Sequence, residues 1–162
     1  MAAPSLDSDH PGLQVLAEVA GVLAAGVDSQ ETLASIVAAL RRGLRLRRCR
    51  LWLRTPEGAG YTAVTTPGDE VELPGYAAPV AEWLQQGSHR EAIPGGMLLR
   101  LPLVHEDESL GVLEVIVPPG RFAGMAHDVL VVVAQILAPV IAATELSQDL
   151  ASEVALSTRE VE

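Results

Sequence analysis

Residues 48–54 read RCRLWLR, so arginine and tryptophan alternate with apolar residues. A strand of this pattern has one apolar face and one polar face, here formed by Arg48, Arg50, Trp52 and Arg54. Arginine binds carboxylates and phosphates through paired N–H donors. If this face lines a pocket, it could hold an anionic ligand. In the alternative interpretation the arginines pair with acidic surface groups and Trp52 packs beneath a loop.

A second group of charges lies within residues 97–117, MLLRLPLVHEDESLGVLEVIV. Two strand-like runs flank the polar break HEDES. Pairing Val104 with Leu110 across this break places Arg100 directly opposite Glu114, a cross-strand pair worth about 0.2–1 kcal/mol. Both faces are otherwise apolar. We therefore expect an antiparallel hairpin near the centre of a sheet that is covered on both sides.

These two segments and one short helix define a candidate ligand site. Trp83 lies in VAEWLQQ, residues 80–86, which follows Pro79 and precedes Gly87 as a short helix does. The predicted inner side of this helix is Ala81, Trp83 and Leu84. The candidate ligand-binding residues are Arg50, Trp52, Trp83, Arg100 and Glu114.

Composition excludes several function classes. The formal net charge of −10 argues against nucleic-acid binding, although residues 41–54 are rich in arginine. A single cysteine excludes an internal disulfide and a multi-cysteine metal site, and it favours a reducing, cytoplasmic setting. The N-terminus has no signal-peptide pattern. The apolar stretch from residue 129 to residue 143 is shorter than the ~20 residues of a spanning helix, so we interpret it as a buried or interface helix and expect no membrane partner.

The remaining elements can be placed from their periodicity. Helices are expected over 13–25 and 28–43, the second with Asp28 and Glu31 as a capping box. A hairpin is expected over 44–55 and 61–66, and short edge strands near 70–73 and 91–93. The sequence thus predicts an α+β fold with a central antiparallel sheet of about six strands. Its N- and C-terminal helices cover one face, and loops with the short helix cover the other.

A long helix is expected from about Met125 to the end of the chain. Its first half is densely apolar, whereas beyond Glu145 only a narrow apolar seam remains. A wide stripe is typical of a core and a narrow one of a coiled coil. We therefore expect a homodimer formed by the terminal helices, and a continuation toward a further domain. The predicted interface residues are Val129, Val133, Ile136, Val140, Leu146 and Leu150.

The order of these elements resembles that of a GAF domain. The resemblance rests on RCRLWLRTPEGAGYTAV, LRLPLVHEDESLGVLEVIVP and RFAGMAHDVLVVVAQILAPVIAATEL, and it covers residues 13–146. It implies a six-stranded antiparallel sheet with a ligand pocket roofed by loops, and a regulatory role in bacterial signalling proteins. Residues 1–12 are then a disordered tail, and residues 147–162 a signalling helix that extends toward a downstream domain.

The ligands of this family can be tested against the sequence. Cys49 falls on the apolar strand face, which indicates a buried structural thiol rather than a bilin attachment site. The cyclic-nucleotide motif contains lysine, and this chain has none. His89 is the best candidate for a haem ligand, yet an exposed histidine is the simpler interpretation. The HEDE turn at 105–108 is a poor metal site, so we expect no metal and no cofactor.

Catalytic residues are not expected, because no nucleophile–base pair or phosphate loop occurs at usable spacing. The leading hypothesis is a non-enzymatic sensory domain, the input part of a sensor histidine kinase. The alternative is an effector domain of a transcription regulator that binds an anionic metabolite or nucleotide.

Overall fold

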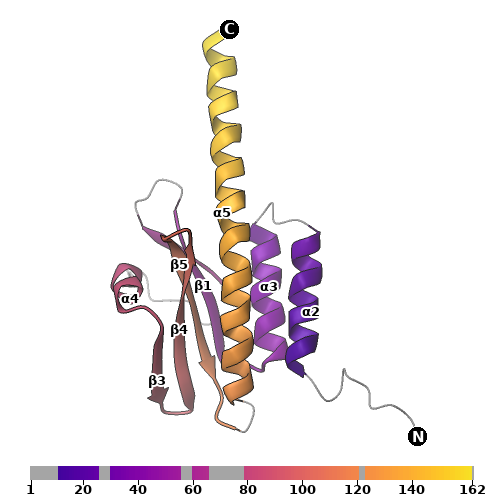
Figure 1. Cartoon of the computed structure of the whole chain (residues 1–162), viewed down its shortest axis with the longest axis vertical. Helices are drawn as coiled ribbons and strands as arrows, with labels where there is room; N and C mark the ends of the chain where they lie inside the picture. Colours follow the sequence, from indigo (N-terminus) through magenta and orange to yellow (C-terminus); the bar gives the residue numbers. More distant parts are fainter. Residues whose placement is uncertain (1–10, 26–29, 56–59, 66–78, 121–122, 162) are drawn as a thin grey trace, which may run out of the picture.

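The computed structural model describes residues 11–25, 30–55, 60–65, 79–120 and 123–161. The chain forms an α+β domain from which one long helix projects (Figure 1). Two helices come first, α2 (Pro11–Ala24) and α3 (Gln30–Gly43), and they lie side by side. Strands β1 (Arg48–Arg54) and β2 (Tyr61–Val64) follow, then helix α4 (Val80–Gln86). Strands β3 (His89–Ile93), β4 (Gly96–His105) and β5 (Glu108–Val117) lead into α5 (Ala123–Val161).

The five described strands form one antiparallel sheet in the order β2-β1-β5-β4-β3. The central position of β5 agrees with the expected placement of the hairpin. Helices α2, α3 and α5 lie on one face, and α4 lies on the other (Figure 1). The expected architecture is therefore confirmed, with five strands in the described residues rather than about six. The expected edge strand at 70–73 lies outside the described residues.

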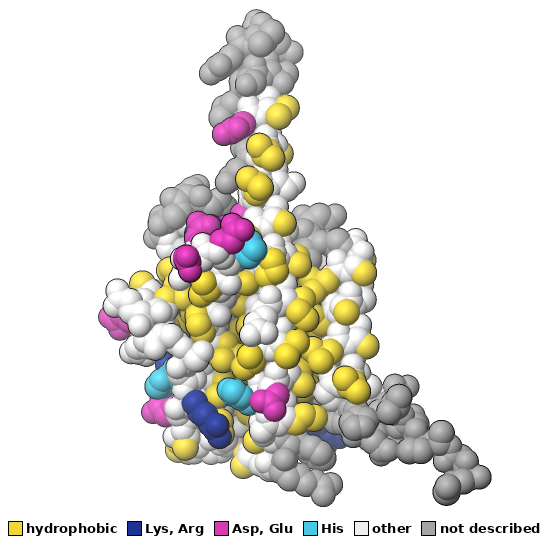
Figure 2. Space-filling view, viewed as in Figure 1, with side chains coloured by type: hydrophobic (Ala, Val, Ile, Leu, Met, Phe, Trp, Pro, Cys, Tyr) yellow, Lys and Arg dark blue, Asp and Glu magenta, His cyan; other side chains and the backbone are white. Residues whose placement is uncertain are grey.

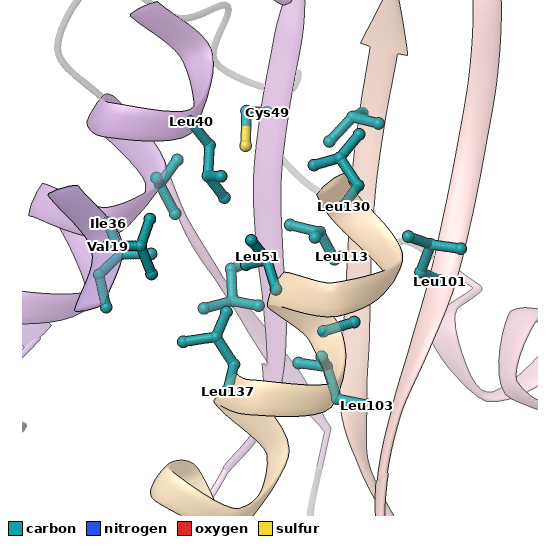
Figure 3. Packing of buried hydrophobic residues seen from close by; sticks show 14 of the residues in the cluster. Val19, Ile36, Leu40, Cys49, Leu51, Leu101, Leu103, Leu113, Leu130 and Leu137 are labelled. Atoms are coloured by element: carbon teal, nitrogen blue, oxygen red, sulfur yellow. The ribbon is translucent and has the colours of Figure 1, made fainter. Parts of the chain in front are cut away.

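The main core lies between the sheet and the three helices. Strand residues Leu51, Leu101 and Leu113 point toward Leu130 and Leu137 of α5 (Figure 3). Cys49 is also in this core and is fully buried, as the alternation of β1 predicts. Alternate strand residues thus supply one apolar layer, and the face that carries α4 receives the residues between them.

The pairing of β4 with β5 confirms one part of the predicted register and corrects another. Arg100 lies opposite Glu114, as expected. Val104, however, pairs with Ser109 and not with Leu110, because a bulge follows Leu103. The extra residue turns Leu110 into the main core, where it is fully buried.

The hairpin turn is also shorter than the expected five-residue break. His105 pairs with Glu108, so only Glu106 and Asp107 form the loop. Both have positive φ, 50° and 66°, as a type I′ turn requires. This two-residue turn agrees with the right-handed twist of the strands and brings Glu108 to the end of the sheet.

Several boundaries differ from those expected. Pro11 and Gly12 belong to α2, so the predicted 1–12 tail is at least two residues shorter, and residues 1–10 lie outside the described residues. The capping residue proposed for α3, Asp28, also lies outside them. Helix α3 ends with Arg45 in the left-handed region (φ 53°) and with the Leu46 N–H donating to the Arg41 carbonyl. This is the Schellman arrangement, with arginine where glycine is usual.

Helix α5 runs for 39 residues without interruption and passes through Pro139. Its first part covers the sheet, and its second part extends beyond the domain (Figure 1). By length and composition alone, Ala123–Ser147 is the one stretch of the described chain that could cross a membrane. Val133 and Leu137 from this stretch are buried in the main core, as residues of a core helix are.

Candidate functional site

Three charged side chains lie in one row across the face of the sheet that carries α4, here named the outer face. Arg50 of β1 and Arg100 of β4 are both the direct cross-strand partners of Glu114 on β5. Adjacent strands are about 5 Å apart, so the glutamate lies between two arginines. Arg50 is 2% exposed and Glu114 is 4% exposed.

The ion pair between Arg100 and Glu114 is direct. The Arg100 Nε donates to Glu114 Oε2 at 3.1 Å, and the Arg100 side chain is 19% exposed. The Arg100 guanidinium also lies 4.1 Å from the ring centroid of Trp83. A carboxylate on one edge and an aromatic face together hold the guanidinium in place, which leaves its other N–H donors in a fixed orientation.

The two tryptophans of the chain meet above this row. Trp52 and Trp83 have ring centroids 6.0 Å apart with planes at 74°, an edge-to-face contact. With Val80 and Val112 they form a second, smaller core on the outer face. On α4 the buried residues are Val80 and Trp83, whereas Ala81 is exposed. The predicted inner side of this helix was therefore wrong at Ala81, because the first turn faces the sheet through Val80.

Trp52 carries a buried polar group of interest. Its side chain is 7% exposed, and within the described part of the chain its Nε1–H has no hydrogen-bond partner. A buried N–H without a partner costs about 1–3 kcal/mol, so such groups are often completed by a ligand or water.

All five candidate ligand-binding residues thus come together in a single cluster, named here the outer cluster: Arg50, Trp52, Trp83, Arg100 and Glu114. They arrive from β1, α4, β4 and β5. The cluster contains two arginines, one glutamate and an indole N–H that has no partner among the described residues. Arg100 and Trp52 could therefore donate hydrogen bonds to an anion.

Arg54 does not belong to the outer cluster, contrary to the face expected from alternation. Its Nη2 donates to Glu145 Oε2 of α5 at 2.7 Å, and its Nε lies 3.3 and 3.2 Å from the two oxygens of the same carboxylate. Its Nη1 donates to Glu108 Oε1 of β5 at 2.8 Å. The hydrogen bonds to Glu145, and then those to Glu108, raise the pKa of Arg54 above its usual value, so this residue remains charged.

Sequence reasoning missed this contact because nothing local indicates it. Arg54 and Glu145 are 91 positions apart, and Arg54 resembles the other arginines of the segment. The alternative interpretation, that strand arginines pair with acidic groups, is confirmed for Arg54. One of its two partners, Glu145, lies on the long helix.

The other candidate residues lie apart from one another. His89 is on β3 and lies 3.4 Å from Glu91, and His105 precedes the hairpin turn. Among the described residues no group of three or more His, Cys, Asp or Glu side chains could hold a metal ion.

The predicted interface residues divide into two sets. Val129 and Val133 are buried in the main core of their own chain, so the prediction that they form a dimer interface was wrong. Ile136 is 39% exposed, Val140 is half-buried, and Leu146 and Leu150 are 61% and 53% exposed. The reason is that the first turns of α5 direct their apolar side to the sheet, while the later turns have no sheet beside them.

A cavity of about 560 Å³ lies elsewhere, between the end of α3 and the start of α5. Its lining is mainly apolar and includes Leu44, Val117, Pro118 and Met125, together with Arg45. None of the residues of the outer cluster lines this cavity.

No protein-family model matches the sequence, and no curated protein matches it either. Several solved structures, however, match the fold of this chain. The GAF domain of a phosphoenolpyruvate-protein phosphotransferase from Acinetobacter matches with a TM-score of 0.61 at 18% identity, over 92% of this chain and 99% of that one. The corresponding domain from Coxiella burnetii matches with a TM-score of 0.66 at 17% identity, over 86% and 97%.

A third match is the GAF domain of a protein described as a sensor histidine kinase, from Pseudomonas syringae pv. tomato. It has a TM-score of 0.61 at 16% identity and covers 89% of this chain and 95% of that one. The matched domains are covered almost completely, and they agree with the sheet and helix arrangement derived above. The chain has the fold of a GAF domain.

Proposed function

We propose that this chain is a non-enzymatic sensory input domain of a bacterial signalling protein of the sensor histidine kinase type, acting in the cytoplasm. The observation that carries the proposal is the double role of α5. One continuous helix supplies core residues such as Leu130 and Leu137 and then leaves the domain with an exposed apolar stripe. A change in how the sheet packs on the helix is therefore transmitted along it toward a downstream domain.

The exposed stripe supports a homodimer. Hydrophobic side chains gather along α5 and continue onto its projecting part (Figure 2). The exposed apolar residues are spaced as in a helical seam: Val132, Ile136, Leu146, Leu150 and Val154. A helix that projects alone into water leaves this seam uncovered, whereas an identical parallel helix covers it with the same pattern. Such a pair directs both C-termini toward the same downstream domains.

Sedimentation velocity over a range of protein concentrations tests this proposal. We expect a dimer that dissociates on dilution, and a monomer when Leu146 and Leu150 are both replaced by serine. Val104→Ser is the control, because Val104 is 47% exposed but belongs to β4 and not to the projecting part of α5. A monomer at every concentration would refute the dimer, as would a dimer that the double variant leaves intact.

A second candidate function is that of an effector domain of a transcription regulator that binds an anionic metabolite or nucleotide. The buried Trp52 Nε1–H and the neighbouring guanidinium of Arg100, which Trp83 and Glu114 hold in place, favour it. Thermal-shift measurements with a panel of nucleotides and small carboxylates test it. We expect one compound class to raise the melting temperature of the native chain but not of Arg100→Gln. Equal shifts in both proteins, or no shift with any compound, would argue against this function.

A further inference from the structure

Three side chains from three elements meet where α5 leaves the domain. We name them the Arg54 clamp: Arg54 of β1, Glu108 of β5 and Glu145 of α5. Arg54 bonds both carboxylates, with its closest contacts at 2.7 Å to Glu145 and 2.8 Å to Glu108. The side chains of Arg54 and Glu145 are only 29% and 27% exposed, so water screens this ion pair less than it screens a surface pair.

The position of Glu145 along α5 makes this contact informative. The next residue, Leu146, is 61% exposed, and the described side chains beyond it are exposed as well. Glu145 thus marks the transition between the part of the helix that the domain holds and the part that projects. A change at this residue alters the direction and the stability of the projecting part.

Strand β1 joins the clamp to the outer cluster. Trp52 and Arg54 are separated by one residue, so their Cα atoms are about 6.6 Å apart along an extended strand. Trp52 packs on Trp83 of α4, and Arg54 holds Glu145 of α5. Helices α4 and α5 lie on opposite sides of the sheet (Figure 1). Strand β1 is therefore attached to both helices, to α4 through Trp52 and to α5 through Arg54.

We infer that the Arg54 clamp couples the outer cluster to the projecting part of α5, with Arg54 as the positioning residue. A displacement of β1 at Trp52 moves Arg54, and Arg54 moves Glu145. The inference deepens the proposed sensory function and rests on it, because it names the contact through which the outer face reaches the output helix. The coupling acts within one chain and needs no second copy.

The two tryptophans provide a direct test, since both belong to the outer cluster and the chain has no others. Glu145→Gln removes the charge from α5, on the other side of the sheet. We expect it to shift the tryptophan emission and to change the acrylamide quenching of the folded protein. Glu18→Gln is the matched control, because it breaks the Arg42–Glu18 ion pair between α2 and α3. It should leave both tryptophan signals unchanged.

The reciprocal measurement follows the helix. In Trp83→Phe, which removes the larger ring from the outer cluster, amide hydrogen exchange over residues 143–150 should rise by roughly tenfold, the effect of losing one charged hydrogen bond. Exchange in α2 and α3 should stay as in the native chain. Both measurements are made in the Leu146→Ser, Leu150→Ser background, so that their outcome does not depend on dimerisation.

Reversing the charges of the ion pair between β1 and α5 tests whether the pair itself positions the helix, or whether any substitution at these residues disturbs the fold. In the triple variant Arg54→Glu, Glu108→Gln, Glu145→Arg, the ion pair between β1 and α5 is restored with its charges reversed, and no carboxylate of β5 opposes the new acid on β1. We expect it to restore the native tryptophan emission that each single variant loses. If Glu145→Gln gives the native emission and quenching, the outer cluster and α5 are not coupled and the inference is overturned, whatever the oligomeric state.

Discussion

At the scale of single residues, the outer cluster combines two arginines with one glutamate on a buried face. Such a group is stabilising only if the charges remain balanced, because an unpaired charge in the interior is strongly unfavourable. Glu114 is the single anion of the cluster and lies between Arg50 and Arg100. Its charge is therefore central to the stability of the outer face.

Replacing Glu114 with glutamine should lower the free energy of unfolding by about 3 kcal/mol, because it breaks the largely buried ion pair with Arg100. Urea denaturation followed by tryptophan fluorescence measures this effect. Glu91→Gln is the control: Glu91 is an exposed residue of β3 and should change stability by less than about 0.5 kcal/mol. Equal stability of Glu114→Gln and the native chain would show that the ion pair has no structural importance.

A second residue-scale prediction concerns Gly111, at the bulge of β5. A Cβ at this position would overlap the carbonyl oxygen of Trp52 on the neighbouring strand, and backbone cannot move aside as a side chain can. Gly111→Ala should therefore destabilise the domain and separate β1 from β5. Gly21→Ala, in the last turn of α2 with open space around it, should stabilise by about 0.4–1 kcal/mol. Thermal denaturation of the two variants should give melting temperatures that move in opposite directions.

At the scale of elements, α5 carries a residue that disfavours its own conformation. Pro139 is exposed and lies in the interior of the helix, where it cannot donate the hydrogen bond to the Gln135 carbonyl. Pro139→Ala should stabilise the domain, by at least about 1 kcal/mol out of the ~3 kcal/mol that an interior proline costs. Circular dichroism during heating measures it. An unchanged or lower melting temperature would mean that the helix is already adapted to proline at this point.

The strand pattern was sufficient to predict which residues pair at the centre of the sheet. Arg100 and Glu114 are the only charges within the two predicted strand runs, 97–104 and 110–117, and the apolar alternation around them leaves one register that matches them. The bulge at Leu110 could not be predicted, because one additional residue in a uniformly apolar run does not alter its composition. The contact of Arg54 with Glu145 depends on where a distant helix leaves the sheet, and local periodicity contains no information on that.

The candidate ligand residues lie together on the outer face, and the sequence explains part of this placement. Arg50 and Trp52 alternate with the core residues Cys49 and Leu51, so they had to face away from the main core. Their contact with Trp83 was less predictable, because it requires α4 to pack on that same face. The division of α5 into core and surface residues could not be resolved, since valine at 129 and 133 suits a sheet or a partner helix equally well.

At the scale of the whole molecule, the domain has two covered sheet faces and one projecting helix. The outer face holds a charged and aromatic cluster, the opposite face holds the main core, and α5 connects that core to the projecting seam (Figures 1 and 2). The Arg54 clamp lies at the junction of these parts. In the proposed dimer, the projecting part of α5 pairs with the same segment of a second copy, in parallel and in register.

Cysteine cross-linking tests this claim most directly. In a parallel pair identical positions of the seam face each other, so Leu150→Cys should form a disulfide-linked dimer under mild oxidation. Ala155→Cys is the control, because its exposed side chain lies on the other side of the helix, and the native Cys49 is buried and does not compete. We expect rapid, nearly complete cross-linking at position 150 and little at position 155. Equal cross-linking at both positions, or none at position 150, would contradict the proposed pairing.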